Sequence, residues 1–262
     1  MCFLYFISLF SFFFLIPPFS VCFAQSQKPL QTSTLTVAAA ADLRFVLPEI
    51  ISPFQTLNPD VKVEVIYGAS GKFYEQILRG APFDIFLSAD KEYPFLLYTK
   101  GYVAEEPFQY AVGRLVLWMR KGLFGEGKDW KELLTNKKVS KIALANPLHA
   151  PYGKAAKTAL ENAGLWEKLD SKFVYGENVI QAFQFAEEKD AELAFIPLTI
   201  ALSPKASKEG NYVEIPLSFY PKILQYGIII KKTANLSIAK KFKDYLLSEE
   251  SQKTLKKYGF GP

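Results

Sequence analysis

The stretch VIYGASGKFYEQI, residues 65–77, is the part of the sequence from which the fold can be worked out. It opens with β-branched and aromatic residues, the pattern of a buried strand, and continues into a small-residue turn, Gly68–Gly71. Apolar residues then return at helical spacing at Phe73 and Ile77. A helix start leaves backbone N–H groups unpaired and carries the positive end of the helix dipole. The turn is therefore a candidate anion seat to which the Ser70 hydroxyl adds a donor, although many such turns only redirect the chain.

Composition limits the class of protein. The chain has 262 residues, half of them hydrophobic, which allows one large domain or two modest lobes. The formal net charge of +5 arises entirely from Lys28 onward. The lysines are scattered, with small clusters near residues 137–141 and 239–257, which is typical of solvated faces. A nucleic-acid surface would interleave basic residues with stacking aromatics on one face, so we expect no nucleic-acid partner.

The N-terminal segment has the pattern of an export signal. Residues 2–16 are almost wholly apolar, and Pro17-Pro18 and the small residue Ala24 follow. This pattern predicts a secretory signal peptide over residues 1–24 and a periplasmic or other extracytoplasmic location. The first residues contain no Lys or Arg, and Cys22 stands three positions before the cut. A lipoprotein signal ending at Cys22 and an uncleaved anchor, for which the run is short, stay open as alternatives.

The distribution of cysteine and histidine argues against a metal cofactor. Both cysteines, Cys2 and Cys22, lie in the predicted signal peptide, which excludes a disulfide framework and a Cys-based metal site from the mature chain. His149 is the only histidine and is expected to pack in a turn. Asp84 and Asp90 are better explained by capping or packing than by acid–base chemistry. With no nucleophile–base pair visible, we expect no cofactor and no enzyme activity.

Strand–helix units repeat along the chain. Three consecutive units predict a parallel, doubly wound sheet, with strands expected at 34–37, 61–67 and 83–87. A second set has strands at 141–144, 173–175 and 193–196, with helices from Gly153 and Val179. Two long strands without a preceding crossover helix, 110–118 and 224–230, separate the sets, and two helices, 237–247 and 252–258, close the chain.

These units predict an α/β protein with two lobes, each built on a doubly wound sheet, joined by two crossover strands. Lobe 1 would comprise residues 34–109 and 224–262, and lobe 2 residues 110–223. A cleft between such lobes is a usual place for a ligand.

Four strand-to-helix junctions are the candidate ligand contacts: Asp42, Ser70, Tyr152 and Val179. In open α/β sheets these junctions lie at the carboxyl ends of the strands, where ligands bind. None places a Lys or Arg at its centre. A compact oxyanion held by N–H groups and hydroxyls needs no counter-ion, because the backbone dipoles supply distributed positive potential.

Several segments carry a resemblance to a known family. They are, in chain order, VAAAADL (37–43), YGASG with QI (67–71 and 76–77), GAPFDIFLSAD (80–90), ANP with HAPYG (145–147 and 149–153), ENV (177–179) and YGF (258–260). Together they resemble the periplasmic molybdate-binding proteins of ABC transporters, in the right order and over nearly all of the mature chain. The string in residues 80–90 is the most specific part.

The resemblance implies a two-lobed, hinged solute-binding protein that captures molybdate or tungstate and passes it to a membrane permease with an ATPase. We expect a monomer. By resemblance, the ligand contacts would be the Ser70 hydroxyl and amide and the backbone N–H groups of Tyr152 and Val179. Asp42, where the family often has Ser, would give its amide and turn its side chain away to cap the helix. A tyrosine that donates its hydroxyl in some members aligns with Pro197, which cannot donate.

Alternatives stay open at this point. The oxyanion could be molybdate, tungstate, sulfate or phosphate, because the choice depends on cavity dimensions. Two other classes are an enzyme on the same two-lobed fold and a ligand-sensing module that partners a membrane receptor.

Overall fold

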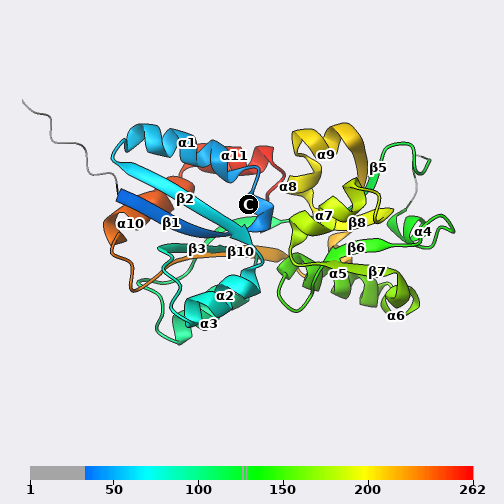
Figure 1. Ribbon diagram of the computed structural model, residues 1–262, viewed down its shortest axis with the longest axis horizontal. Helices are drawn as coiled ribbons and strands as arrows, with labels where there is room; N and C mark the ends of the chain where they lie inside the picture. Colours follow the sequence, from blue (N-terminus) through cyan, green and yellow to red (C-terminus); the bar gives the residue numbers. More distant parts are fainter. Residues whose placement is uncertain (1–32, 126, 128, 262) are drawn as a thin grey trace, which may run out of the picture. The chain divides into compact units, whose positions relative to one another are not determined.

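Two five-stranded sheets organise the computed structural model, which describes residues 33–125, 127 and 129–261 (Figure 1). The strand orders are β2-β1-β3-β10-β4 and β7-β6-β8-β5-β9. The described residues fall within one compact unit, and the predicted signal peptide lies outside them. We call the first sheet with its helices lobe 1 and the second sheet with its helices lobe 2. The α/β class and the two-sheet architecture predicted from the sequence are confirmed.

Lobe 1 is built around β1 (Ser33–Ala40), whose second half is fully buried. Its parallel neighbours are β2 (Val61–Gly68) and β3 (Ile85–Ser88), and β10 (Ile223–Ile229) runs antiparallel to β3 and to β4 (Phe108–Gly113). One face is covered by α1 (Leu47–Leu57), α10 (Leu236–Leu246) and α11 (Glu249–Lys257), and the other by α2 (Ser70–Leu78) and α3 (Glu92–Thr99) (Figure 1).

The helices of lobe 1 present apolar stripes to these two faces. Phe54 and Phe242 meet edge to face between α1 and α10, with ring centroids 5.1 Å apart. Phe73 of α2 packs in the same manner on Phe83, at 5.6 Å. Because β1 leads through α1 to β2 on one side and β2 leads through α2 to β3 on the other, right-handed crossovers place α1 and α2 on opposite faces.

Lobe 2 repeats this plan with β6 (Ile142–Ala145) between β7 (Phe173–Gly176) and β8 (Leu193–Pro197). Strands β5 (Leu115–Arg120) and β9 (Gly210–Glu214) complete the sheet. The flanking helices are α4 (Trp130–Leu134), α5 (Pro151–Asn162), α6 (Trp166–Leu169), α7 (Val179–Glu187), α8 (Leu198–Ala201) and α9 (Pro204–Glu209). Short 3-10 turns, η1 (Ala41–Leu43), η2 (Asp170–Lys172) and η3 (Leu217–Phe219), lie between elements.

Two predictions of local structure are wrong, and one strand was missed. The long strand expected over residues 110–118 is two strands, β4 in lobe 1 and β5 in lobe 2, because the chain crosses between the sheets at Arg114. Strand β9 was not expected, since its sequence GNYVE is mostly polar and exposed. The helix expected directly after Asp42 is the single turn η1, and α1 begins only at Leu47 with Pro48 in its first turn, where proline is tolerated.

Among the described residues, none of the helices combines the length and the apolar character that crossing a bilayer requires.

Candidate functional site

The four predicted junction residues line a single cavity. In lobe 1, Ala40 and Gly68 are partners at the ends of neighbouring parallel strands, which places Asp42 beside Ser70. In lobe 2, Ala145 and Gly176 are partners in the same way, which brings the start of α5 near the start of α7. One cavity is lined by residues that follow the carboxyl ends of strands in both lobes. Its lining residues are Ala40, Ala41, Asp42, Gly68, Ala69, Ser70, Ala89, Ala150, Pro151, Tyr152, Asn178 and Val179.

The cavity is small, about 10 Å³. A space of that size holds about one water molecule, so sugars, amino acids and peptides do not fit. Small side chains and backbone form most of the lining, and no Lys or Arg is part of it. A larger occupant than water enters only when the two lobes move apart.

Lobe 1 contributes Ser70, whose side chain is fully buried. The Ser70 Oγ accepts a hydrogen bond from the Ala89 N–H at 3.0 Å, which leaves the hydroxyl hydrogen to be donated elsewhere. Ser70 is also the first residue of α2, and the N-cap Ala69 makes no side-chain cap. Within the described chain no acceptor is paired with the Ser70 N–H, whereas the next N–H, of Gly71, donates to the His149 carbonyl at 2.9 Å. Ser70 therefore offers two donors at one point.

Lobe 2 contributes backbone donors. Helix α5 begins with Pro151, which has no N–H, and the Lys154 N–H makes the first helical bond, to the Ala150 carbonyl at 3.0 Å. The Tyr152 N–H lies in the first turn, before this first helical bond, and so has no acceptor within the helix. Helix α7 is capped by Asn178, whose Oδ1 accepts from the Ile180 and Gln181 N–H groups at 2.9 and 3.2 Å. The cap thereby leaves the Val179 N–H for a ligand.

The chemistry of this donor set is that of an anion site. Helix-start N–H groups and a hydroxyl donate hydrogen bonds, and the dipoles of α2, α5 and α7 add positive potential. In the part of the chain that the structure describes, no group of three or more His, Cys, Asp or Glu side chains could hold a metal ion. The chemistry of the donors around the cavity therefore suits a small anion, admitted when the lobes move apart.

Comparison with known proteins also finds relatives that bind a small anion. Residues 35–261 match the family described as bacterial extracellular solute-binding protein. The molybdate-binding protein ModA of Azotobacter vinelandii is 36% identical over 232 residues, covering 88% of this chain and 91% of the relative. ModA of Rhodobacter capsulatus is 34% identical over 234 residues, covering 88% and 90%. The solved structure of the Azotobacter vinelandii periplasmic molybdate-binding protein superposes with a TM-score of 0.81 at 30% identity, covering 87% of this chain and 99% of that one.

The chain belongs to the bacterial extracellular solute-binding proteins. The superposition with the solved structure covers both lobes of this chain. It leaves the ligand of this chain to be argued from the cavity.

Asp42 is the main departure from the site expected by resemblance to the family. Its side chain was predicted to cap a helix, which is wrong, since η1 and α1 have no side-chain cap. The residue is 1% exposed, and its carboxylate accepts from Gln225 Nε2. The Thr199 hydroxyl donates to its carbonyl at 3.0 Å. Burial raises the pKa of the Asp42 carboxyl to about 6, against the opposing hydrogen bonds of Gln225 and Tyr152.

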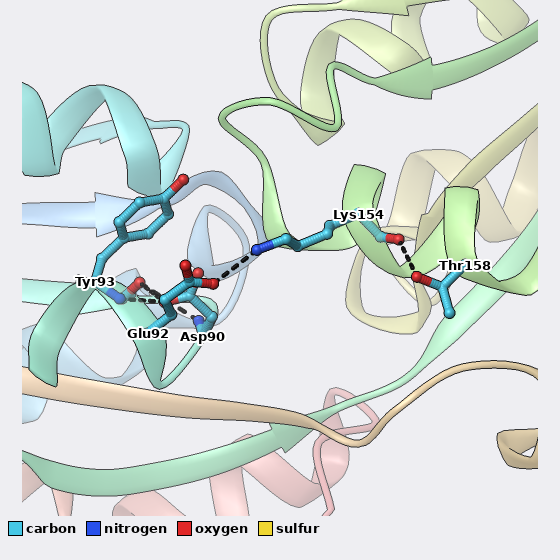
Figure 2. Close-up of polar contacts among 6 residues, drawn as sticks. Asp90, Glu92, Tyr93, Lys154 and Thr158 are labelled. Carbon is cyan, nitrogen blue, oxygen red and sulfur yellow. Dashed lines mark hydrogen bonds and ion pairs between the residues drawn. The ribbon is translucent and has the colours of Figure 1, made fainter. Parts of the chain in front are cut away.

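Contacts at the rim hold the lobes together. Figure 2 shows Lys154 of α5 reaching the Glu92 carboxylate at the start of α3, a Nζ–Oε2 distance of 2.7 Å. Both side chains are more than half exposed. Beside Glu92, Asp90 accepts from the Tyr93 N–H at 3.1 Å and from the Ser88 hydroxyl at 3.0 Å, and burial raises its pKa to about 6. On the His149 side, Nδ1 lies 3.8 Å from Glu75 Oε1. The structure is therefore a closed arrangement of the lobes.

The sequence pointed to four of the lining residues and missed others. Ala89, whose N–H binds Ser70, lies in the string SAD of the family resemblance, which was a usable signal. Gln225 and Thr199 had none, because neither stands at a strand-to-helix junction of the predicted set. Pro197 ends β8 and is not part of the cavity lining. The assignment of Asp42, Ser70, Tyr152 and Val179 as ligand contacts stays a prediction.

Proposed function

We propose that this protein binds molybdate or tungstate outside the cytoplasm and delivers it to an ABC transporter. The observation that carries the proposal is the meeting of Ser70 with the starts of α5 and α7 around one small cavity that contains hydrogen-bond donors and no cationic side chain. The names of the relatives in Azotobacter vinelandii and Rhodobacter capsulatus support the choice of molybdate.

The mechanism follows from the division of donors between lobes. The open protein takes up the anion on lobe 1 at the Ser70 hydroxyl and N–H. Closure then brings the Tyr152 and Val179 N–H groups onto its remaining oxygens, and the contact energy made in the closed state favours that state. The donors come from the starts of three helices, α2 in lobe 1 and α5 and α7 in lobe 2, so they reach the anion from both lobes. Reopening at the permease releases the anion.

The donor set also favours some oxyanions over others as the ligand. A fully deprotonated dianion accepts from every donor around the cavity. Hydrogen phosphate carries its own O–H, which would need an acceptor, whereas the groups proposed to contact the anion, the Ser70 hydroxyl and N–H and the Tyr152 and Val179 N–H groups, all act as donors. An O–H buried without a partner is costly, so the site favours molybdate, tungstate or sulfate over phosphate. Cavity size must separate the first two from sulfate.

Calorimetric titration of the purified protein with molybdate, tungstate, sulfate and phosphate tests the proposal. We expect tight binding of molybdate and tungstate, weaker binding of sulfate and no heat with phosphate. The absence of binding for all four anions would overturn it. A Ser70→Ala variant is the site control, because it removes one donor and leaves the backbone intact.

We propose the remaining properties on the same basis. The protein is a monomer exported by its N-terminal segment, carries no cofactor, and acts as a binding protein rather than an enzyme. Its partners are a permease and an ATPase. Neighbouring genes for both would support transport, and a neighbouring membrane receptor gene would favour the sensing alternative.

A further inference from the structure

We propose that Gln225 is a positioning residue that couples the two halves of the anion site. It would do so by fixing Asp42 of lobe 1 and Tyr152 of lobe 2 through one side-chain amide. The inference rests on the proposed function, because its readout is the affinity for the oxyanion.

Gln225 lies behind the cavity rather than in it. It is fully buried on β10, the strand that returns the chain from lobe 2 to lobe 1, and it is not among the lining residues. The pairing of β10 with β4 shifts register between Gln225 and Tyr226, the mark of a bulge. Bulges re-aim side chains, which accounts for a polar side chain turned inward at this point.

The amide of Gln225 contacts both lobes at once. Its Nε2 donates to Asp42 Oδ2 and to Tyr152 Oη, the latter at 3.1 Å, which uses both amide hydrogens. Asp42 and Tyr152 are residues whose backbone N–H groups are assigned to the anion. One side chain therefore sets the positions of two main-chain segments that would contact the ligand.

The space around this contact is tightly packed. A Cβ added at Gly113, where β4 ends before the crossing at Arg114, would lie 2.1 Å from Tyr152 Oη and 3.0 Å from Gln225 Nε2. The Thr199 hydroxyl of lobe 2 holds the Asp42 carbonyl from another side, at 3.0 Å. Asp42 is thus held through its carboxylate by Gln225 and through its main-chain carbonyl by Thr199.

The network is not the most stable one that these residues could form. Asp42 Oδ1 and Gln225 Oε1 are buried without a partner among the described residues, and unpaired buried oxygens are destabilising. Replacing such groups by apolar ones is often neutral or stabilising. A buried polar contact that is costly and bridges two lobes is better explained by positioning than by stability.

The contact also orients the Asp42 carboxylate through its Oδ2 atom. The hydrogen bond from Gln225 holds the carboxylate toward a residue outside the cavity lining. Without it the carboxylate could rotate toward the bound dianion, where repulsion in a dry site is large. Gln225 therefore acts on affinity both through geometry and by keeping a negative charge away.

The test compares five variants for molybdate affinity by calorimetry and for the midpoint of thermal unfolding without ligand. Gln225→Met keeps the volume and removes the hydrogen bonds, and we expect binding weakened about 10- to 100-fold. Tyr152→Phe removes one of the two bonds of Gln225, together with the hydrogen bond of Tyr152 to Asp42, and should weaken binding about 3- to 10-fold. Gln225→Glu faces Asp42 with a second carboxylate and should be the weakest binder. The double variant Asp42→Asn/Gln225→Glu exchanges donor and acceptor and should bind within about threefold of the wild type.

Gln252→Met is the matched control. Gln252 Nε2 also makes two hydrogen bonds, to the Tyr110 and Leu246 carbonyls at 3.1 Å each, but neither of these partners lines the cavity, whereas both partners of Gln225 do. It should lower the unfolding temperature and leave the affinity unchanged. Wild-type affinity in Gln225→Met and Tyr152→Phe, or an exchange variant that binds no better than Gln225→Glu alone, would overturn the inference. A wild type that binds no oxyanion would instead overturn the proposed function.

Discussion

The two halves of the cavity reach a similar donor pattern by different means. Lobe 1 relies on a side-chain donor, the Ser70 hydroxyl oriented by the Ala89 N–H, and its neighbouring Asp42 carboxylate is held by the Gln225 side chain. Lobe 2 uses main chain: α5 starts on Pro151, and Asn178 caps α7 so that the Val179 N–H is spared. The lobe 1 half should therefore respond to changes of side chain, and the lobe 2 half to changes that move the backbone.

Gly153→Ala, in lobe 2, should have the largest effect on stability and on molybdate binding. A Cβ at Gly153 would lie 2.0 Å from the Ala145 carbonyl oxygen, so the start of α5 would have to move away from β6. Overpacking typically costs about 1 to 3 kcal/mol, and a contact with fixed backbone belongs at the upper end; the Tyr152 N–H moves with the helix. We expect a large fall in unfolding free energy by denaturant titration and loss of molybdate binding by calorimetry.

Two other glycines sharpen this test. Gly125→Ala meets no atom within 4 Å and should leave both measurements unchanged. In lobe 1, a Cβ at Gly71 would lie 2.9 Å from the His149 carbonyl oxygen, across the cavity rim. Gly71→Ala should therefore oppose closure and weaken binding with a smaller loss of stability. Equal losses of stability in Gly71→Ala and Gly153→Ala would contradict the distinction between the lobes.

The Asp42 carboxyl should give lobe 1 a pH-dependent stability. Its pKa is raised from 3.8 to about 6 by burial, so the folded protein holds a proton that the unfolded chain releases between these values. The free energy of unfolding should fall as pH rises from about 4 to about 6 and stay level above, a change of about 3 kcal/mol from this group.

Comparing unfolding of the wild type and Asp42→Asn across this range isolates the contribution. The variant should gain stability relative to the wild type as pH rises, because Asn keeps an acceptor for Gln225 and carries no charge. Asp60→Asn, at an exposed carboxyl, is the control and should follow the wild type. A constant difference between the wild type and Asp42→Asn at all pH values would show that Asp42 does not titrate in this way.

The same comparison shows what could be predicted from the sequence. The junctions YGASG and ENV can be predicted because small or capping residues stand between a strand pattern and a helix pattern. This signal is local in the sequence. The Asp42–Gln225 contact joins residues 183 positions apart and depends on a bulge in β10, so no local pattern predicts it. The split of residues 110–118 into β4 and β5 was hidden because both strands are apolar on either side of Arg114.

Ser70→Ala and Val179→Ala compare a side-chain donor with a main-chain donor. Loss of the Ser70 hydroxyl removes a hydrogen bond to a charged ligand, worth about 2 kcal/mol or roughly a 30-fold loss of affinity. Val179→Ala keeps the N–H and should stay within about twofold of the wild type. Calorimetry with molybdate measures both. A Val179→Ala variant as weak as Ser70→Ala would mean that lobe 2 also depends on its side chains.

The rim ion pair should have the smallest effect. Lys154 and Glu92 join the lobes at 2.7 Å, yet their side chains are 61% and 56% exposed. An exposed pair contributes about 0.5 kcal/mol and is screened by salt, so Lys154→Met should weaken molybdate binding about twofold at low ionic strength and not at about 1 M salt. Lys157→Met is the matched control, since Lys157 pairs with Glu161 inside α5 at 3.6 Å and does not span the lobes. If both variants lower the affinity equally, the effect comes from the overall charge of α5 rather than from a contact that holds the lobes closed.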